Sequence, residues 1–132
     1  MKPSSLLTSA AIYLALIGTV LQLFPIMAFG LDANAPALLI ANLRVPASLL
    51  FAIAVTNWFA RNSDASRARD AILLGNLVAF VLVAIGDFIL SMMPGGDPIG
   101  FVFAFINLCF AIAFFVVGRA NMSTRTSATA LS

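Results

Sequence analysis

Residues 99–118 read IGFVFAFINLCFAIAFFVVG, a stretch without any charged side chain. An α-helix rises about 1.5 Å per residue, so a helix of this length crosses the roughly 30 Å hydrocarbon core of a bilayer. The preceding turn supplies a start signal, because Asp97 is a good N-cap and Pro98 suits the first helical position. This stretch therefore predicts a transmembrane helix over about residues 98–119.

Three further apolar segments of similar length lie upstream and predict helices over about residues 5–25, 37–60 and 65–92. Residues 1–120 are therefore predicted to form one all-α domain, a four-transmembrane-helix bundle with up-down-up-down topology. Residues 121–132 are rich in Ser, Thr and Ala and show no periodicity, so we expect a disordered cytoplasmic tail.

The loops contain candidate start signals for two of these helices. Asn34 together with Pro36 is expected to open the second helix, and Ser63 or Asp64 the third.

The composition argues against a water-soluble fold and against most familiar redox and metal chemistry. Hydrophobic residues make up 62% of the 132 positions and charged residues 9%, against about half and a quarter in soluble domains. The chain has no histidine, no glutamate and one cysteine, which disfavours metal centres, haem and disulfides. Asp87 is the only acid within the apolar part of a predicted helix, which for the third helix runs from about 71 to 92, and it has no base beside it. We therefore expect no enzyme, no metal and no cofactor.

The basic residues indicate the orientation of the chain. The two loops after the first and third spans contain Asp32 and Asp97 and no basic residue. Under the positive-inside rule, both termini and the loop at 61–70 are then cytoplasmic in an inner (plasma) membrane. This explains the net charge of +2 without nucleic-acid binding. The residues on the basic side are Lys2, Arg61, Arg67, Arg69, Arg119 and Arg125.

Small residues at helical spacing predict where the helices touch, because small side chains let backbones approach in lipid. Such stripes either pack one monomer or dock another subunit. The phenylalanines of the fourth helix lie mostly away from its stripe, as expected for contact with lipid or a partner protein. The predicted faces are Ala11, Ala15, Gly18 and Gln22; Arg44, Ser48, Ala52 and Val55; Gly75, Ala79 and Gly86; and Gly100, Ala104, Asn107, Ala111 and Gly118.

Two opposite charges lie within the predicted spans. Arg44 and Asp87 both occupy the outer half of the membrane, and helical side chains lean so that their charged ends converge. We expect an ion pair between the second and third helices. In the alternatives, Arg44 binds a lipid phosphate or a carboxylate while Asp87 orients it, or the two side chains snorkel without pairing. Pro46 frees the backbone carbonyl of Asn42, which adds a kink and an acceptor nearby.

The other polar residues of the spans are expected to join helices. An inter-helix hydrogen bond within a membrane contributes about 0.6–2 kcal/mol. Trp58 and the following Arg61 lie near the end of the second span, where they are typical of an interfacial anchor. The predicted inter-helix contacts are Gln22, Asn42, Ser48, Asn76 and Asn107.

Part of the sequence resembles a known group of proteins. The runs NLRVP at 42–46, NWFAR at 57–61, RDAI at 69–72 and GNL at 75–77 are similar to a broad group of uncharacterised bacterial four-span inner-membrane proteins. The resemblance implies a four-span topology and a bacterial source. It implies no activity.

These patterns favour a non-catalytic integral membrane protein. The leading hypothesis is an accessory or structural subunit that packs against a larger membrane complex or forms a homo-oligomer, or that holds a lipid or a pigment. The alternative is a small proton- or anion-coupled transporter that uses Asp87 and Arg44, because an acid within a span can couple protons and an arginine can bind anions.

Overall fold

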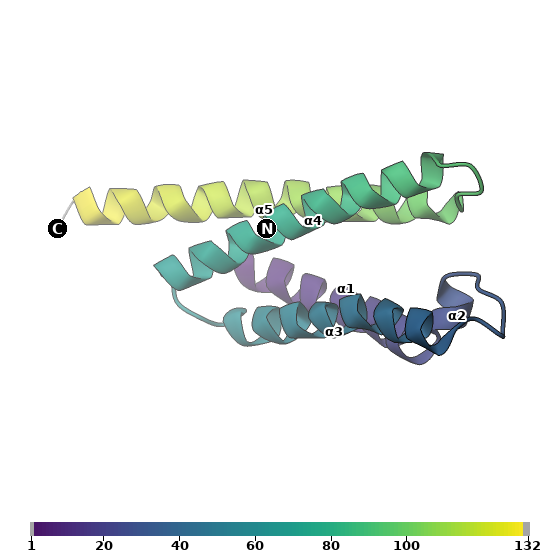
Figure 1. The fold of residues 1–132 in the computed structure, drawn as a ribbon. Coiled ribbons are helices and arrows are strands. Elements are labelled where there is room, and N and C mark those ends of the chain that lie inside the picture. The colour runs from purple at the N-terminus through teal and green to yellow at the C-terminus, as the bar shows by residue number, and fades with distance from the viewer. Residues whose placement is uncertain (1, 131–132) are drawn as a thin grey trace. The chain divides into compact units, whose positions relative to one another are not determined.

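A computed structural model describes the backbone of residues 2–130 and the side chains of residues 2–122. The backbone that it describes is helical and contains no strand. Four of its helices are long and apolar enough to cross a membrane, so the chain has the make-up of a multi-pass membrane protein. The elements are α1 (Pro3–Leu23), α2 (Pro25–Ala28), α3 (Ala37–Ala60), α4 (Arg67–Met92) and α5 (Ile99–Ala130), as Figure 1 shows.

The helix bounds agree with the sequence except near the two ends of the chain. The first helix ends at Leu23, and Pro25 begins the separate short helix α2. At the other end, α5 continues to Ala130, past the position where we predicted a disordered tail. No glycine or proline follows Gly118, so the sequence contains no residue that would stop the helix there. Residues 131 and 132 of the predicted tail lie outside the described residues.

The N-cap residues differ from the prediction at two of the three helices for which we predicted them. At α5 the prediction is confirmed, because Asp97 Oδ1 accepts a hydrogen bond from the backbone N–H of Ile99 at 2.9 Å. At α4 the N-cap is Ser66 and not the predicted Ser63 or Asp64. The hydroxyl of Ser66 accepts a hydrogen bond from the backbone N–H of Arg69 at 3.2 Å. At α3 Pro36 occupies the cap position and no side chain caps the helix.

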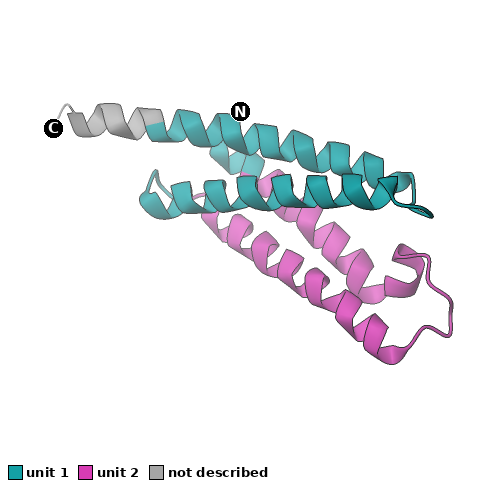
Figure 2. Cartoon of the chain, turned by 45° about the horizontal axis from the view of Figure 1, so that its top comes forward, with its two compact units in different colours: residues 1–6, 63–132 teal, residues 7–62 magenta. Residues whose placement is uncertain are grey.

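The chain divides into two compact units, which Figure 2 colours separately: residues 1–6 with 63–132, and residues 7–62. The first unit contains the α4–α5 hairpin. Its contacts follow α4 backward while they follow α5 forward, from Ser91 beside Gly100 to Leu73 beside Gly118. The two helices are therefore antiparallel neighbours joined by the short turn at 93–98.

The predicted small stripe of α5 is the face that meets α4. Ala104, Asn107 and Ala111 are all buried. A Cβ placed on Gly100 would lie 2.1 Å from the hydroxyl of Ser91, so only glycine fits here as the side chains now stand. In return, α4 contributes large side chains, with Leu73 and Phe80 buried. The large side chains of α4 thus pack against the small residues of α5.

The aromatic side chains correct part of the prediction for α5. Phe110 and Phe114 do not face lipid, because both stack on Phe80 of α4, with ring centroids 4.8 and 5.6 Å apart. Phe101 meets Phe88 edge to face at 5.5 Å. Stacked and edge-to-face rings add about 0.5–1.5 kcal/mol beyond their burial, so these pairs hold the hairpin together.

The second unit contains the rest of α1, together with α2 and α3. Gly18 lies against α3, since a Cβ placed on it would be 3.3 Å from the backbone oxygen of Ala47 and 3.4 Å from the ring of Phe51. The contact face of α3 therefore includes Ala47 and not the predicted row with Arg44, which is exposed. The predicted stripe on α1 does reach α3 through Gly18.

Large apolar side chains remain exposed along all four long helices. Examples with more than half of their surface open are Leu16, Leu49, Leu82 and Phe105. In water such surfaces would drive aggregation, whereas in a bilayer they contact acyl chains. The exposed faces therefore agree with the length and composition of the helices.

Candidate functional site

The most distinctive polar contact within a span joins Asp87 of α4 to Asn107 of α5. The amide nitrogen of Asn107 donates to Asp87 Oδ2 at 2.9 Å. Asn107 is buried and Asp87 is half-buried, so the contact lies at the seam of the hairpin. A hydrogen bond to a charged group in a region of low dielectric is stronger than one between neutral groups. The amide therefore stabilises a carboxylate that lipid alone would solvate poorly.

Sequence reasoning named both residues but did not pair them. Both lie within about two helical turns of the connection at 93–98. In an antiparallel hairpin, residues at similar distances from the turn come side by side. The turn signal around Asp97 could therefore have predicted that Asp87 and Asn107 lie close together.

Arg44 lies in the other unit, on α3. Its side chain is exposed, and its backbone oxygen accepts a hydrogen bond from the hydroxyl of Ser48 at 3.3 Å. The predicted contact of Ser48 is thus made within its own helix, and Asn42 is exposed. The expected ion pair between Arg44 and Asp87 would join the two units and stays a prediction.

Gln22 and Asn76 were also expected to join helices. Asn76 is buried, and its amide nitrogen donates to the backbone oxygen of Ile72 in the same helix at 2.8 Å. The side-chain oxygen of Gln22 is buried and accepts no hydrogen bond from the described residues. Such an unsatisfied oxygen costs stability and identifies a weak point in α1.

Trp58 and Arg61 interact with each other at the end of α3. The guanidinium carbon of Arg61 lies 3.5 Å from the centroid of the indole ring, and Nη1 donates to the backbone oxygen of Trp58. A cation–π contact of this kind contributes about 0.5–1 kcal/mol at an exposed site. The pair has the amphipathic character of an interfacial anchor, which remains the predicted role.

A second polar cluster, which sequence reasoning missed, closes the other end of the hairpin. Arg69 Nη2 donates to the side-chain oxygen of Asn121 at 2.5 Å, and the amide nitrogen of Asn121 donates to Asp70 Oδ1 at 2.5 Å. Arg69 Nη1 also donates to the backbone oxygen of Ser63 at 2.7 Å. The cluster ties α4, α5 and the preceding loop together. Because we assigned Asn121 to a disordered tail, the sequence prediction could not include it.

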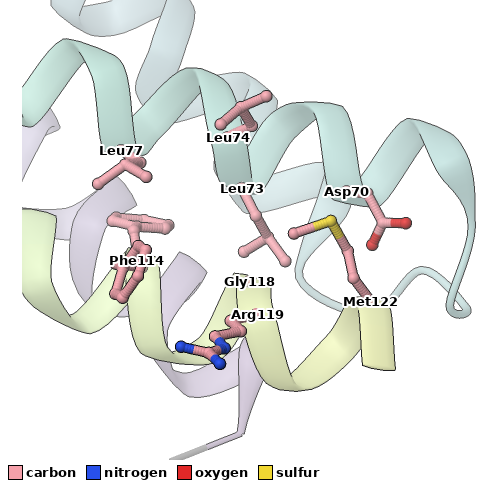
Figure 3. A pocket seen from close by; sticks show the side chains of 9 residues that line it. Asp70, Leu73, Leu74, Leu77, Phe114, Gly118, Arg119 and Met122 are labelled. Atoms are coloured by element: carbon pink, nitrogen blue, oxygen red, sulfur yellow. The ribbon is translucent and has the colours of Figure 1, made fainter. Parts of the chain in front are cut away.

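A cavity of about 190 Å³ lies beside this cluster, between α4 and α5. Figure 3 shows Leu73 and Leu77 of α4 and Phe114 of α5 along the cavity. Asp70 and Met122 lie together toward one end of it, and Arg119 projects from α5 beside it. The lining is almost entirely apolar, apart from the charged groups of Asp70 and Arg119.

The polar groups of α4 and α5 described above mainly make contacts between the two helices. Across the described residues, no group of three or more Cys, Asp, Glu or His side chains could hold a metal ion. Asp87 contacts an amide, and Asp70 contacts another amide in the cluster with Arg69. Each carboxylate thus acts as a hydrogen-bond acceptor between α4 and α5.

Comparisons of the chain with protein-family models, with curated proteins and with solved structures found no match.

Proposed function

We propose that this protein is a non-catalytic integral membrane subunit that packs against a larger membrane complex through α4. The supporting observation is an open row of small residues formed by Gly75, Ala79 and Gly86. A Cβ placed on Gly75 or Gly86 would meet no atom within 4 Å. On a helix that turns by about 100° per residue, this row faces away from the α5-facing residues Leu73 and Phe80.

A row of this kind is suited to helix docking within lipid. Lipid tails are as apolar as leucine, so helices associate by close packing and hydrogen bonds and not by exclusion from water. Two glycines and an alanine on one face let a partner backbone approach closely, and the exposed Leu82 on the same face provides a side chain to pack around it. The partner is accordingly a transmembrane helix of another protein.

The proposal includes the orientation of the chain. The basic residues Arg61, Arg67 and Arg69 lie at or near the connection between α3 and α4, and Arg119 lies in the second half of α5. The positive-inside rule supports a cytoplasmic location for this side and for both termini, with up-down-up-down topology in an inner membrane.

Extraction in a gentle detergent followed by native sizing tests the proposal. We expect the protein to migrate with a larger assembly, and Gly75→Leu with Gly86→Leu to release it while the melting temperature of the purified protein stays within a few degrees. Thr56→Leu, an exposed position on α3, is the control and should leave the assembly intact. An unmodified protein that already migrates as a monomer or homodimer, or an assembly that survives both glycine substitutions, contradicts the proposal.

A transporter remains the second candidate, since a half-buried carboxylate inside a span is the kind of group that couples protons. As a transporter, the protein would exchange a proton at Asp87 and attract an anion at Arg44. Proteoliposomes with an entrapped pH-sensitive dye provide the test. Dissipation of an imposed pH gradient should be abolished by Asp87→Asn and unaffected by Asp97→Asn in the turn. A rate equal to that of protein-free liposomes excludes this candidate.

A further inference from the structure

The cavity beside Leu73 and Phe114 has the lining of an acyl-chain site and room for part of one chain. Its volume is about 190 Å³, and a cavity of about 150 Å³ lined by Leu, Ile and Phe is large enough to take up benzene. It extends along α4 from Asp70 to Leu77, a rise of roughly 10 Å from the first turn of the helix into the apolar span. An acyl chain of a membrane lipid also runs from the polar interface into the apolar core, which is the direction of this cavity.

Charged side chains lie at one end of the cavity. Arg119 lines the cavity and is exposed. Asp70 also lines the cavity, but its carboxylate accepts a hydrogen bond from Asn121, which is bonded in turn to Arg69. Since two arginines, Arg69 and Arg119, lie here with the one carboxylate of Asp70, the net charge of these three groups is positive.

We propose that the α4–α5 hairpin binds one anionic phospholipid, with an acyl chain in this cavity and the headgroup phosphate on Arg119. A guanidinium forms strong charge-assisted hydrogen bonds with phosphate oxygens. The apolar walls distinguish a phospholipid from free phosphate, since they offer an inorganic anion no partner. The site does not depend on the proposed docking row, which is a separate set of residues on α4.

Native mass spectrometry of the delipidated full chain tests the proposal, with phosphatidylglycerol and phosphatidylcholine of identical chains as probes. We expect at least fivefold tighter binding of phosphatidylglycerol, and Arg119→Gln to reduce that preference about fivefold, which is the effect of one basic residue near a membrane surface. Arg67→Gln is the matched control, because Arg67 does not line the cavity. It should retain most of the preference.

Gly118→Leu tests the chain pocket separately. The nearest atom that a Cβ on Gly118 would meet is Cβ of Leu73, at 4.0 Å, so the helix tolerates the substitution while the new side chain fills the cavity. We expect loss of both lipids and an unchanged helical circular dichroism spectrum. Equal binding of the two lipids, equal effects of the two arginine variants, or undiminished binding by Gly118→Leu each overturn the proposal. A dimer that Gly118→Leu disrupts would assign the cavity to a second copy and would also overturn it.

Discussion

The two helical pairs of this protein are stabilised in different ways. In the α4–α5 hairpin, hydrogen bonds join the helices at Asp87 with Asn107 and at Asp70 with Asn121, and stacked rings fill the space between. The α1–α3 pair instead relies on close approach, with Gly18 against the backbone of Ala47. The hairpin is closed by the short turn at 93–98, whereas residues 24–36, including α2, connect the other pair.

The difference shows two solutions to association within lipid. Polar contacts fix the register of the two helices, because an amide reaches a carboxylate at one position only. Close packing of small residues is less specific and depends on the absence of every extra atom. The hairpin should therefore be sensitive to loss of single polar groups, and the α1–α3 pair to gain of bulk.

The largest effect is expected at the turn that closes the hairpin. A Cβ on Gly96 would lie 2.4 Å from the backbone oxygen of Leu90 and 2.9 Å from that of Ser91, so Gly96→Ala forces the backbone apart. We expect a loss of about 3 kcal/mol, the upper end for overpacking, measured by thermal unfolding in detergent. Gly75→Ala adds the same methyl group in open space and is the control. Equal melting temperatures for the two variants would contradict the structure of the turn.

A smaller loss should follow added bulk in the α1–α3 pair. Gly18→Leu pushes against the backbone of Ala47 and the ring of Phe51, and we expect a cost of about 2 kcal/mol. The neighbouring Thr19 is exposed, so Thr19→Leu should leave unfolding nearly unchanged. Indifference of the protein to both changes would mean that α1 and α3 do not approach each other at Gly18.

The polar contact of the hairpin can be measured with a double-mutant cycle. Asp87→Leu, Asn107→Leu and the double variant should give a coupling energy of about 0.6–1.7 kcal/mol, the range for hydrogen bonds between membrane helices. The same cycle between Arg44 and Asp87 tests the predicted ion pair. Coupling to Arg44 without coupling to Asn107 would replace the amide as the principal partner of Asp87.

The smallest effect is expected at the end of α3. Arg61→Gln removes a cation–π contact of about 0.5 kcal/mol, which is close to the limit of unfolding measurements. Trp58 is the only tryptophan in the chain, so its fluorescence reports the contact directly. We expect Arg61→Gln to shift the emission and Arg67→Gln to leave it unchanged. A spectrum that does not respond to Arg61→Gln would show that the guanidinium does not lie on the ring.

Sequence patterns predicted what depends on chain-local chemistry. Hydropathy gave the bounds of α3, and the Asp97–Pro98 pair gave the cap of α5, because both signals lie within the segments that they describe. The start of α4 was ambiguous, since Ser63, Asp64 and Ser66 can all cap a helix. Which of them does so depends on the path of the loop.

The contact faces were harder to predict because a small residue marks a possible contact without naming its partner. Gly18 and the stripe of α5 do lie at helix contacts, whereas Gly75 and Gly86 lie open. The side of α4 that packs on α5 is built from large residues such as Phe80, which fit into the hollows of α5 and resemble lipid-facing residues in sequence. The polar cluster at Asn121 was missed for a related reason, since it requires the continuation of α5.

The contact between Asp87 and Asn107 also affects how the hairpin enters the membrane during synthesis. The two residues are 20 positions apart, so the ribosome makes the amide after α4 is complete. At a synthesis rate of about 5–20 residues per second, the ribosome adds Asn107 roughly one to four seconds after Asp87. During that interval α4 alone is a poor candidate for release into lipid, and the translocation machinery benefits from holding it until α5 arrives. We therefore expect the hairpin to insert as a unit, because Asp87 meets its hydrogen-bond donor only after α5 has been made.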